Sequence, residues 1–266
     1  MRKKIKIGVL VSGGGSNLQA IIDGCEKNEI DGQICFVGSD NPEAKGLERA
    51  EKYHIPVFVV NYSSIFHDYC QNVDSASTPS DFDLEEIITK QNIFSSQTPR
   101  DKIRRFFEIR AIAESRLLKE MASYSFDLLV LAGFMRILSP YFIDRINIEP
   151  GKPRIMNIHP ALLPAFPGAD GYGETYRYGC KVGGCTVHFV DYGEDTGPII
   201  GQKSFEIFPD ETLDDVRKKG LEIEWQLYPK CIQLFAENRL EIIPNIHSVN
   251  SNKKKARNIV KILPKN

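Results

Sequence analysis

The fold is decided by the run IKIGVLVSGGGSNLQAII at residues 5–22. Its first part reads as a buried strand, which the three consecutive glycines then break. Ser16 offers an N-cap, and Gln19, three residues later, completes the pattern of a capping box. Apolar residues such as Leu18 and Ile21 follow at helical spacing. The run therefore predicts a strand, a glycine turn and a helix that packs on a sheet.

The rest of the chain repeats this alternation of strand-like and helix-like segments. Residues 127–133, DLLVLAG, give the strongest strand signal, because a continuous apolar run suits a strand covered on both faces. Such alternation is typical of an α/β fold with a mostly parallel, twisted sheet and helices on both faces. Further strands are expected at residues 34–37, 57–60, 155–158, 185–190 and 198–208, and helices at 43–53, 109–121 and 213–238.

Two segments depart from this alternation. Residues 61–99 are rich in Ser, Thr, Asn, Gln and Asp, with only a short helical candidate at 82–89, and we interpret them as a surface insertion or lid. After Pro244 the sequence turns polar and basic, and residues 245–266 are interpreted as a solvated tail. The expected organisation is one domain over residues 1–244 that carries the insertion, followed by the basic polar tail.

Composition limits the classes of function. The 266 residues are 42% hydrophobic, so the chain can bury an ordinary core, and the formal net charge of −1 argues against nucleic-acid binding through bulk charge. The longest strongly apolar run, residues 128–135, is too short for a membrane span, which needs about 20 residues. The start of the chain does not resemble a signal peptide. The six cysteines form no Cys-x-x-Cys pair. We therefore expect reduced thiols, no metal site, and a cytoplasmic protein without membrane or nucleic-acid partners.

The glycine turn is the first candidate site. Glycines let the backbone approach a ligand closely, and the start of a helix presents unpaired N–H groups, so a phosphate is the natural guest. A dinucleotide fingerprint needs a further glycine where Leu18 stands, although Asp40 lies where a ribose-binding acid would follow. A turn needed only for tight packing is an equal alternative.

The second candidate site lies near the middle of the chain. Asn157 and His159 are two residues apart at the carboxyl end of an expected strand, so their side chains point the same way. Ligands of open α/β sheets gather at these carboxyl ends. An amide donor beside an imidazole suits the polarisation of a carbonyl and the movement of a proton.

An acidic turn, DYGEDTGP at residues 191–198, is the third candidate. A carboxylate from this turn, placed beside His159, would raise the pKa of the imidazole and hold it charged. The residues themselves leave three candidates open, namely Asp191, Glu194 and Asp195. His188, which alternates with apolar residues in an expected strand, is interpreted as structural.

Four segments in this order resemble the folate-dependent formyltransferases, and among them those that formylate phosphoribosylglycinamide in purine (IMP) synthesis. The segments are VSGGGSNLQAII at 11–22, LAGFMRILSP at 131–140, NIHPALLP at 157–164, and residues 187–198. With the intervening strands and the last long helix, the resemblance covers most of residues 5–244. It implies a Rossmann-like formyltransferase fold, small-molecule substrates and 10-formyltetrahydrofolate as co-substrate, in a monomer or homodimer.

The resemblance also implies roles for the matching residues. The loop that holds the substrate phosphate is matched by Gly15, Ser16 and Asn17, and a contact to the phosphoribosyl-glycinamide by Glu224. The catalytic trio is matched by Asn157, His159 and Asp195. The folate-binding positions are matched by Arg110, Met135, Arg136, Ile137, Leu138 and Asp191.

The implied reaction transfers the formyl group of 10-formyltetrahydrofolate to the amine of 5'-phosphoribosylglycinamide. Asn157 and a protonated His159 would stabilise negative charge on the formyl oxygen, while Asp195 keeps the imidazole charged and helps to remove the amine's proton. Two stretches depart from the family. Residues 169–174 stand where relatives carry a histidine-containing segment, and the insertion lies where a lid over the folate could form.

Other functions stay in competition at this point. A methionyl-tRNA formyltransferase would need a carboxyl-terminal RNA-binding domain larger than the tail. A formyltetrahydrofolate hydrolase normally carries a regulatory domain ahead of its catalytic part, and another folate-dependent amine formyltransferase would share the trio. A nucleotide-binding oxidoreductase would use the glycine turn but would leave Asn157, His159 and Asp195 unexplained.

Overall fold

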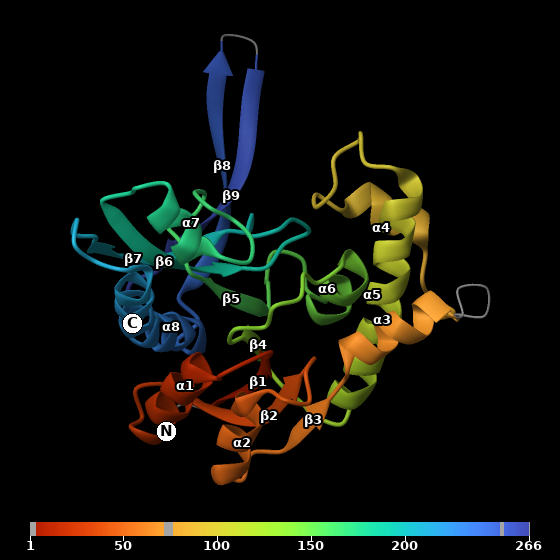
Figure 1. The fold of residues 1–266 in the computed structure, drawn as a ribbon, viewed down its shortest axis with the longest axis horizontal. Helices are drawn as coiled ribbons and strands as arrows, with labels where there is room; N and C mark the ends of the chain where they lie inside the picture. Colours follow the sequence, from red (N-terminus) through yellow and green to blue (C-terminus); the bar gives the residue numbers. More distant parts are fainter. Residues whose placement is uncertain (1–3, 72–76, 251–252, 266) are drawn as a thin grey trace.

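The computed structural model describes residues 4–71, 77–250 and 253–265. A seven-stranded sheet has the order β3-β2-β1-β4-β5-β6-β7 (Figure 1). Strands β1 to β5 pair in parallel, and β6 pairs antiparallel with both of its neighbours. The strands are β1 Ile5–Val11, β2 Gly32–Ser39, β3 Val57–Val59, β4 Leu128–Leu131, β5 Ile155–His159, β6 Val182–Phe189 and β7 Ile199–Glu206. The mostly parallel sheet predicted from the sequence is confirmed.

Helices cover both faces of this sheet, as expected. On one face, β1 residues such as Val9 pack in a cluster with apolar residues of α1 Ser16–Glu26, α2 Lys45–Lys52 and α8 Leu213–Ala236. On the other face, Leu10 packs in a cluster with residues of α3 Tyr62–Gln71, α5 Arg100–Met121 and α6 Pro140–Ile146. Neighbouring residues of β1 thus point to opposite faces, because side chains alternate along a strand. Both faces are apolar, which explains why the strand sequences show no polar alternation.

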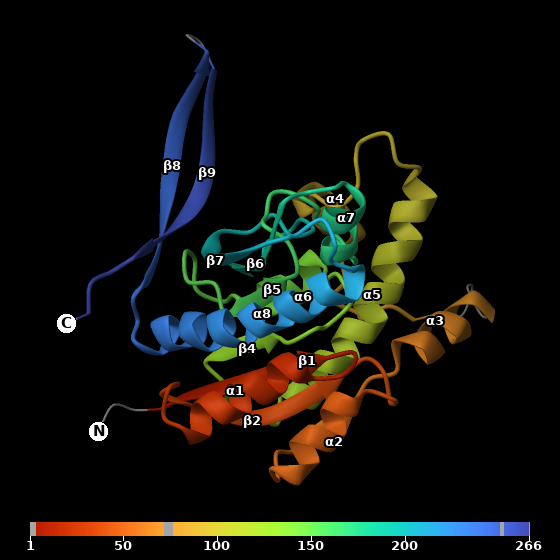
Figure 2. The same ribbon diagram turned by 60° about the vertical axis from the view of Figure 1, so that its left-hand side comes forward.

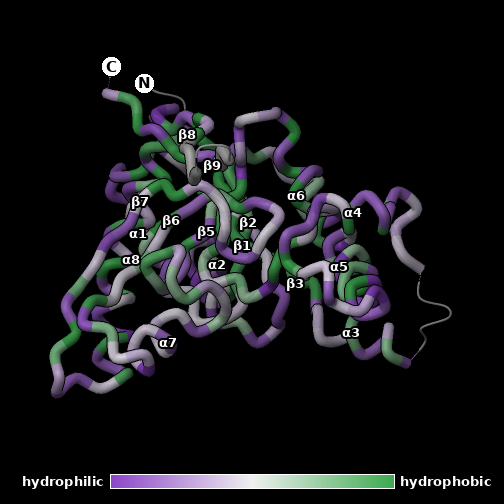
Figure 3. Tube along the Cα trace, turned by 90° about the horizontal axis from the view of Figure 1, so that it is seen from above, coloured by the Kyte–Doolittle hydropathy of each residue, from purple (hydrophilic) through white to green (hydrophobic). Residues whose placement is uncertain are grey.

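The insertion is more ordered than its composition suggests. It contains α3 Tyr62–Gln71, which was not predicted, and α4 Leu84–Lys90, close to the expected short helix. Asp83 caps α4 by accepting hydrogen bonds from the backbone N–H groups of Glu85 and Glu86. Apolar residues of α4 and its flanks pack against α5 and α6 in a third cluster. Figure 3 shows α3 and α4 beside α5, on the side of the molecule away from α8.

The carboxyl-terminal segment does not form the solvated tail that its composition favoured. Strands β8 Leu240–Asn250 and β9 Lys253–Ile262 pair antiparallel in a separate two-stranded sheet. Figure 2 shows this hairpin projecting from the body. Its base is held because Ile242 and Val260 pack against the main core. Within the described ranges, no helix is long and apolar enough to cross a membrane.

Candidate active site

A cavity with a volume of about 660 Å³ lies at the carboxyl ends of the central strands. This volume is ordinary for a small-molecule site. The glycine turn after β1, the segment after β4 and the end of β5 form its walls, together with residues 168–172, the turn 193–195 and part of α8. The three candidate sites of the sequence therefore belong to one cavity, at the sheet edge where ligands of open α/β folds bind.

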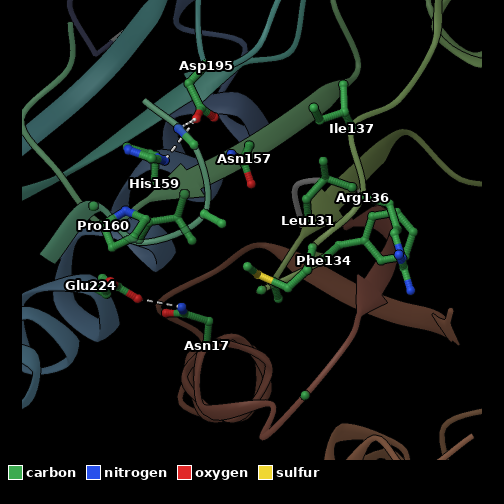
Figure 4. Close-up of a pocket in the computed structure, with 18 of the residues that line it drawn as sticks. Asn17, Leu131, Phe134, Arg136, Ile137, Asn157, His159, Pro160, Asp195 and Glu224 are labelled. Atoms are coloured by element: carbon green, nitrogen blue, oxygen red, sulfur yellow. Dashed lines mark hydrogen bonds and ion pairs between the residues drawn. The ribbon is translucent and has the colours of Figure 1, made fainter. Parts of the chain in front are cut away.

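Asp195 is the acid of the turn that reaches His159. Its Oδ2 atom lies 3.1 Å from Nδ1 of His159, and Nε2 of the same ring lies 2.8 Å from the carbonyl oxygen of Phe166. Both ring nitrogens therefore face oxygen acceptors. Asn157 stands two residues before His159 on β5 and points into the same space (Figure 4). The sequence-predicted trio is brought together in one cavity.

The electrostatics of the pair differ from expectation in one respect. His159 is only 3% exposed, and this burial lowers its pKa below the usual value. Asp195 and the Phe166 carbonyl act in the raising direction but do not outweigh burial, so the net shift is opposite to the raised pKa expected from the sequence. Burial alone would raise the pKa of Asp195, but His188, the charge of His159 and the Gly168 N–H together lower it. The carboxylate is therefore ionised at neutral pH.

The acidic turn holds Asp195 in place through its own backbone. Asp195 adopts a left-handed conformation with φ 53°, and its Oδ2 accepts a hydrogen bond from the Gly168 N–H at 2.9 Å. Asp191 has a different part: its Oδ1 accepts from the Gly193 N–H at 3.1 Å and from the Thr196 hydroxyl at 2.6 Å. Asp191 does not line the cavity, although it was predicted among the folate-binding residues.

His188 lines the cavity, although the sequence pattern predicted a purely structural role for it. It pairs directly with Asn157 across β5 and β6, and its Nε2 lies 3.2 Å from Nδ2 of Asn157. Its Nδ1 lies 2.8 Å from the Phe189 carbonyl, and in the tautomer with the proton on Nδ1 the Nε2 atom accepts from the Asn157 amide. The same Nε2 lies 3.6 Å from Oδ1 of Asp195, to which it donates when it is protonated. The bond from Asn157 to Nε2 leaves one amide hydrogen of Asn157 for a ligand. The signal available in the sequence was a second polar residue on a strand that pairs with β5.

The glycine turn is open at the start of α1. Gly15 is the N-cap with φ 69°, and a Cβ there would stand 2.6 Å from the Cα of Gly46, so only glycine fits. The expected capping box does not form, because Ser16 lies inside the first turn and no side chain caps the helix. Gln19 instead donates to Asp23. The first N–H groups of α1 therefore face the cavity without a side-chain partner.

Glu224 of α8 closes the same end of the cavity. Its side chain is only 4% exposed, and its two oxygens accept from Nδ2 of Asn17 and from the hydroxyl of Tyr172, each at 2.7 Å. Burial raises the pKa of Glu224, while these two donors oppose the rise. Tyr172 comes from the atypical stretch 169–174, which forms the start of α7 Gly171–Arg177, and the sequence did not single it out.

Comparison with known proteins now decides the family. The model of the family described as Formyl transferase matches residues 5–232. The phosphoribosylglycinamide formyltransferase of Bacillus subtilis (strain 168) is 33% identical over 228 residues, which are 86% of this chain and 93% of that protein. The protein of the same name from Escherichia coli (strain K12) is 33% identical over 241 residues, 91% of this chain and 92% of its own length. The chain belongs to the formyl transferase family.

Solved structures agree with this formyl transferase in fold. The crystal structure of glycinamide ribonucleotide transformylase 1 from Symbiobacterium toebii superposes with a TM-score of 0.69 at 33% identity and covers 99% of this chain and 96% of that one. The phosphoribosylglycinamide formyltransferase of Coxiella burnetii, solved with CHES, gives a TM-score of 0.68 at 29% identity, over 91% of this chain and 92% of its own. The seven-stranded sheet is thus the Rossmann-like formyltransferase fold implied by the sequence.

The opposite end of the cavity in this formyl transferase is basic. Arg110 lines it, with its guanidinium 5.5 Å from the ring centre of Tyr62 and 5.1 Å from that of Phe106. Its buried Nε atom has no hydrogen-bond partner among the described residues. Arg136 pairs with Asp40 at 2.5 Å. The segment that was predicted to contact folate also lines the cavity, namely Met135, Arg136, Ile137 and Leu138.

The insertion stands apart from this cavity. Among its described residues, none of 61–71 or 77–99 lines the cavity. The structure thus gives no support to the lid that its length suggested. Six free thiols account for the cysteines, and in the described parts of the chain no group of His, Cys, Asp and Glu side chains is arranged to hold a metal ion.

Proposed function

We propose that this formyl transferase moves the formyl group of 10-formyltetrahydrofolate to the amine of 5'-phosphoribosylglycinamide, a step of purine biosynthesis. One observation carries the proposal: Asn157, His159 and Asp195 converge in a cavity that also contains the open start of α1. The names of the relatives support formyl transfer to phosphoribosylglycinamide.

The acceptor would occupy the end of the cavity near α1. Gly15, Ser16 and Asn17 offer backbone N–H groups and the positive end of the helix dipole to the phosphate. Glu224, fixed by Asn17 and Tyr172, keeps further lone pairs on both oxygens for hydroxyl donors of the acceptor. The acceptor's amine would then lie on the side of the trio.

The folate would occupy the basic end. The backbone of residues 135–138 would contact its ring system, and Arg110 would pair with its carboxylates. The unsatisfied, buried Nε of Arg110 fits such a partner, because a buried N–H donor without an acceptor is costly. Asp191 would act indirectly, by shaping the turn that borders this subsite.

The proposed chemistry follows from the donors that remain free. The acceptor nitrogen forms a bond to the formyl carbon, and negative charge grows on the formyl oxygen. The free amide hydrogen of Asn157 donates to this oxygen, and His159 in its protonated form, which Asp195 favours against burial, supplies positive charge nearby. Asp195 takes the ammonium proton through a water molecule and returns it to the folate nitrogen as the old carbon–nitrogen bond breaks. No net proton is gained or lost between the two nitrogens.

We further propose that residues 1–244 act as the formyltransferase domain, in a cytoplasmic monomer or homodimer that needs no metal. The free thiols suit a reducing compartment. Size-exclusion chromatography with light scattering would decide between monomer and dimer.

An assay with both substrates tests the function. Purified protein is mixed with 10-formyltetrahydrofolate, and tetrahydrofolate is followed with and without phosphoribosylglycinamide. Formation of tetrahydrofolate only with the acceptor supports the proposal. Release of formate without acceptor would indicate a hydrolase, and NAD(P)H binding without formyl transfer would indicate an oxidoreductase.

A further inference from the structure

The second half of the insertion is seated firmly on the body of the protein. Apolar side chains around α4, including Ile87 and Phe94, pack in one cluster with Phe107 of α5 and Tyr141 of α6. Asp81 adds polar contacts, since its carboxylate pairs with Arg145 at 2.6 Å and accepts from the Tyr141 hydroxyl at 3.1 Å. Residues 81–94 are therefore an ordered support, not a loose loop.

This support reaches the acidic turn at Tyr192. The backbone N–H of Asn92 donates to the carbonyl oxygen of Tyr192 at 2.9 Å. The Tyr192 hydroxyl donates to Oδ1 of Asp144 at 2.5 Å, and the other oxygen of Asp144 binds Nζ of Lys90 on α4 at 2.6 Å. The insertion thus contacts Tyr192 twice. Asn92 binds its backbone carbonyl directly, and Lys90 is linked to its hydroxyl through Asp144.

The bonds of Tyr192 and Lys90 to Asp144 keep their protons across the neutral pH range. Burial and the bond to Asp144 raise the pKa of Tyr192 to about 12, so its hydroxyl keeps the proton that it donates. The pKa of Lys90 is raised by its hydrogen bonds to Asp144 and Glu86, so the ammonium stays charged. Asp144 therefore links a permanent cation to a permanent hydroxyl donor.

Tyr192 belongs to the turn that supplies Asp195 to the cavity. The turn that contains both residues is bridged by Asp191, whose Oδ1 accepts hydrogen bonds from the Gly193 N–H and the Thr196 hydroxyl. These bonds close the turn over residues 191–196 and so couple Tyr192 to Asp195, whose carboxylate is also held by the Gly168 N–H. The contact of 3.1 Å between Asp195 and His159 depends on the position of this carboxylate.

We propose that residues 81–94 of the insertion are a brace that positions Asp195 against His159 through Tyr192. The proposal rests on the proposed function only in that the Asp195–His159 pair carries the chemistry. Tyr192, Asn92 and Lys90 are positioning residues and do not touch the substrates. The insertion thus acts on the site from behind the turn instead of covering the cavity.

The test compares two tyrosine-to-phenylalanine variants of matched chemistry. Tyr192→Phe removes the hydroxyl bonded to Asp144 at 2.5 Å. Tyr69→Phe removes a hydroxyl on α3 that is bonded to Glu108 at the same 2.5 Å, and burial likewise raises the pKa of Tyr69 to about 12. The pKa of His159 is measured by NMR of its ring nitrogens without substrates, with its signal assigned by its loss in His159→Gln. Turnover is measured in parallel.

In Tyr192→Phe, we expect the pKa of His159 to fall, because Asp195 moves away and its raising effect weakens. Turnover should fall about ten-fold, in line with a small misplacement of a reacting group. Tyr69→Phe should change neither quantity. A wild-type pKa of His159 in Tyr192→Phe, or equal shifts in both variants, would overturn the brace. Because the NMR measurement needs no substrate, it judges the brace even if acceptor-dependent transfer is absent.

A second variant removes a contact that the insertion itself makes to Tyr192. Asn92→Pro removes the N–H that binds the Tyr192 carbonyl, and the preceding Gln91, with φ −70° and ψ 147°, already has the conformation favoured before proline. It should lower the pKa of His159 in the same direction as Tyr192→Phe. An unchanged titration of His159 in Asn92→Pro would contradict the brace independently.

Discussion

The carboxylate of Asp195 lies 3.1 Å from Nδ1 of His159, on the opposite side of the ring from the Phe166 carbonyl, which lies 2.8 Å from Nε2. Only an imidazolium, with two N–H donors, satisfies both acceptors at once. Burial opposes that charge and lowers the pKa of the ring. The charge on His159 therefore depends on a single carboxylate, held by the acidic turn.

Asp195→Asn removes that carboxylate with little change in size. Because Asp195 raises the pKa of His159 against burial, the variant should lower this pKa further. Turnover should fall by about a hundred-fold or more, as for the loss of one electrostatic element in an active site. NMR titration of His159 and steady-state kinetics check the two parts. Turnover close to wild type would remove Asp195 from the mechanism.

His188→Phe deprives the Asn157 amide of its acceptor at 3.2 Å. We expect turnover to fall about ten-fold with little change in either KM, since the side chain, although it lines the cavity, acts by orienting Asn157. His67→Ala, an exposed change on α3, is the control and should be neutral. A loss confined to KM would mean that His188 binds substrate instead.

Tyr172→Phe removes one of the two donors that hold Glu224. The KM for phosphoribosylglycinamide should rise about ten-fold, because a hydrogen bond to a charged group contributes about 1.5 kcal/mol. The KM for 10-formyltetrahydrofolate should stay unchanged. Equal increases in both KM values would show that the variant disturbs the whole cavity and would contradict a role restricted to the acceptor end.

Glu114→Gln tests a buried carboxyl behind the cavity. Burial raises the pKa of Glu114 from 4.5 to about 7, although it accepts hydrogen bonds from Ser139. A raised folded-state pKa stabilises the protein fully below pH 4.5, and this stabilisation is lost as the pH rises to about 7. Glutamine does not titrate. Relative to wild type, the variant should therefore gain up to about 3 kcal/mol of unfolding free energy across this interval and no more above it.

Denaturant unfolding at a series of pH values measures this difference. If the two proteins kept a constant difference from pH 5 to pH 8, the carboxyl would titrate alike in the folded and unfolded states. The raised pKa would then be wrong.

Sequence patterns predicted the strands and helices that are marked by a continuous apolar run or by a regular spacing of apolar residues. The apolar strand at residues 128–131 and the long helix α8 are such cases, and the alternation of strands with helices gave the sheet. The proximity of the trio followed from the sequence because Asn157 and His159 share a strand end and the family resemblance selected Asp195. Sequence reasoning missed what depends on contacts between distant segments. His188 enters the site only through its pairing with Asn157, and Tyr172 only because α7 packs against α8, where a Cβ on Gly220 would meet its ring at 2.1 Å.

Two further predictions from the sequence, the capping box at Ser16 and the solvated tail at residues 245–266, differ from the structure. Gly15 takes the N-cap because its left-handed φ of 69° and its close approach to Gly46 suit the turn, and this moves Ser16 into the helix. The segment after Pro244 is rich in polar and basic residues although it pairs as a hairpin, so composition alone could not separate a strand pair from a tail. The insertion was interpreted as a surface insertion or lid because it is long and polar, yet its few apolar residues pack against α5 and α6.

The most direct measurement follows a labelled formyl carbon from 10-formyltetrahydrofolate into phosphoribosylglycinamide, with wild-type protein and with Asp195→Asn. The account predicts label in the acceptor, with one tetrahydrofolate formed per formyl group, and a transfer about a hundred-fold slower in the variant although both substrates still bind. Absence of label in the acceptor with wild-type protein, or equal rates in the two proteins, would contradict it.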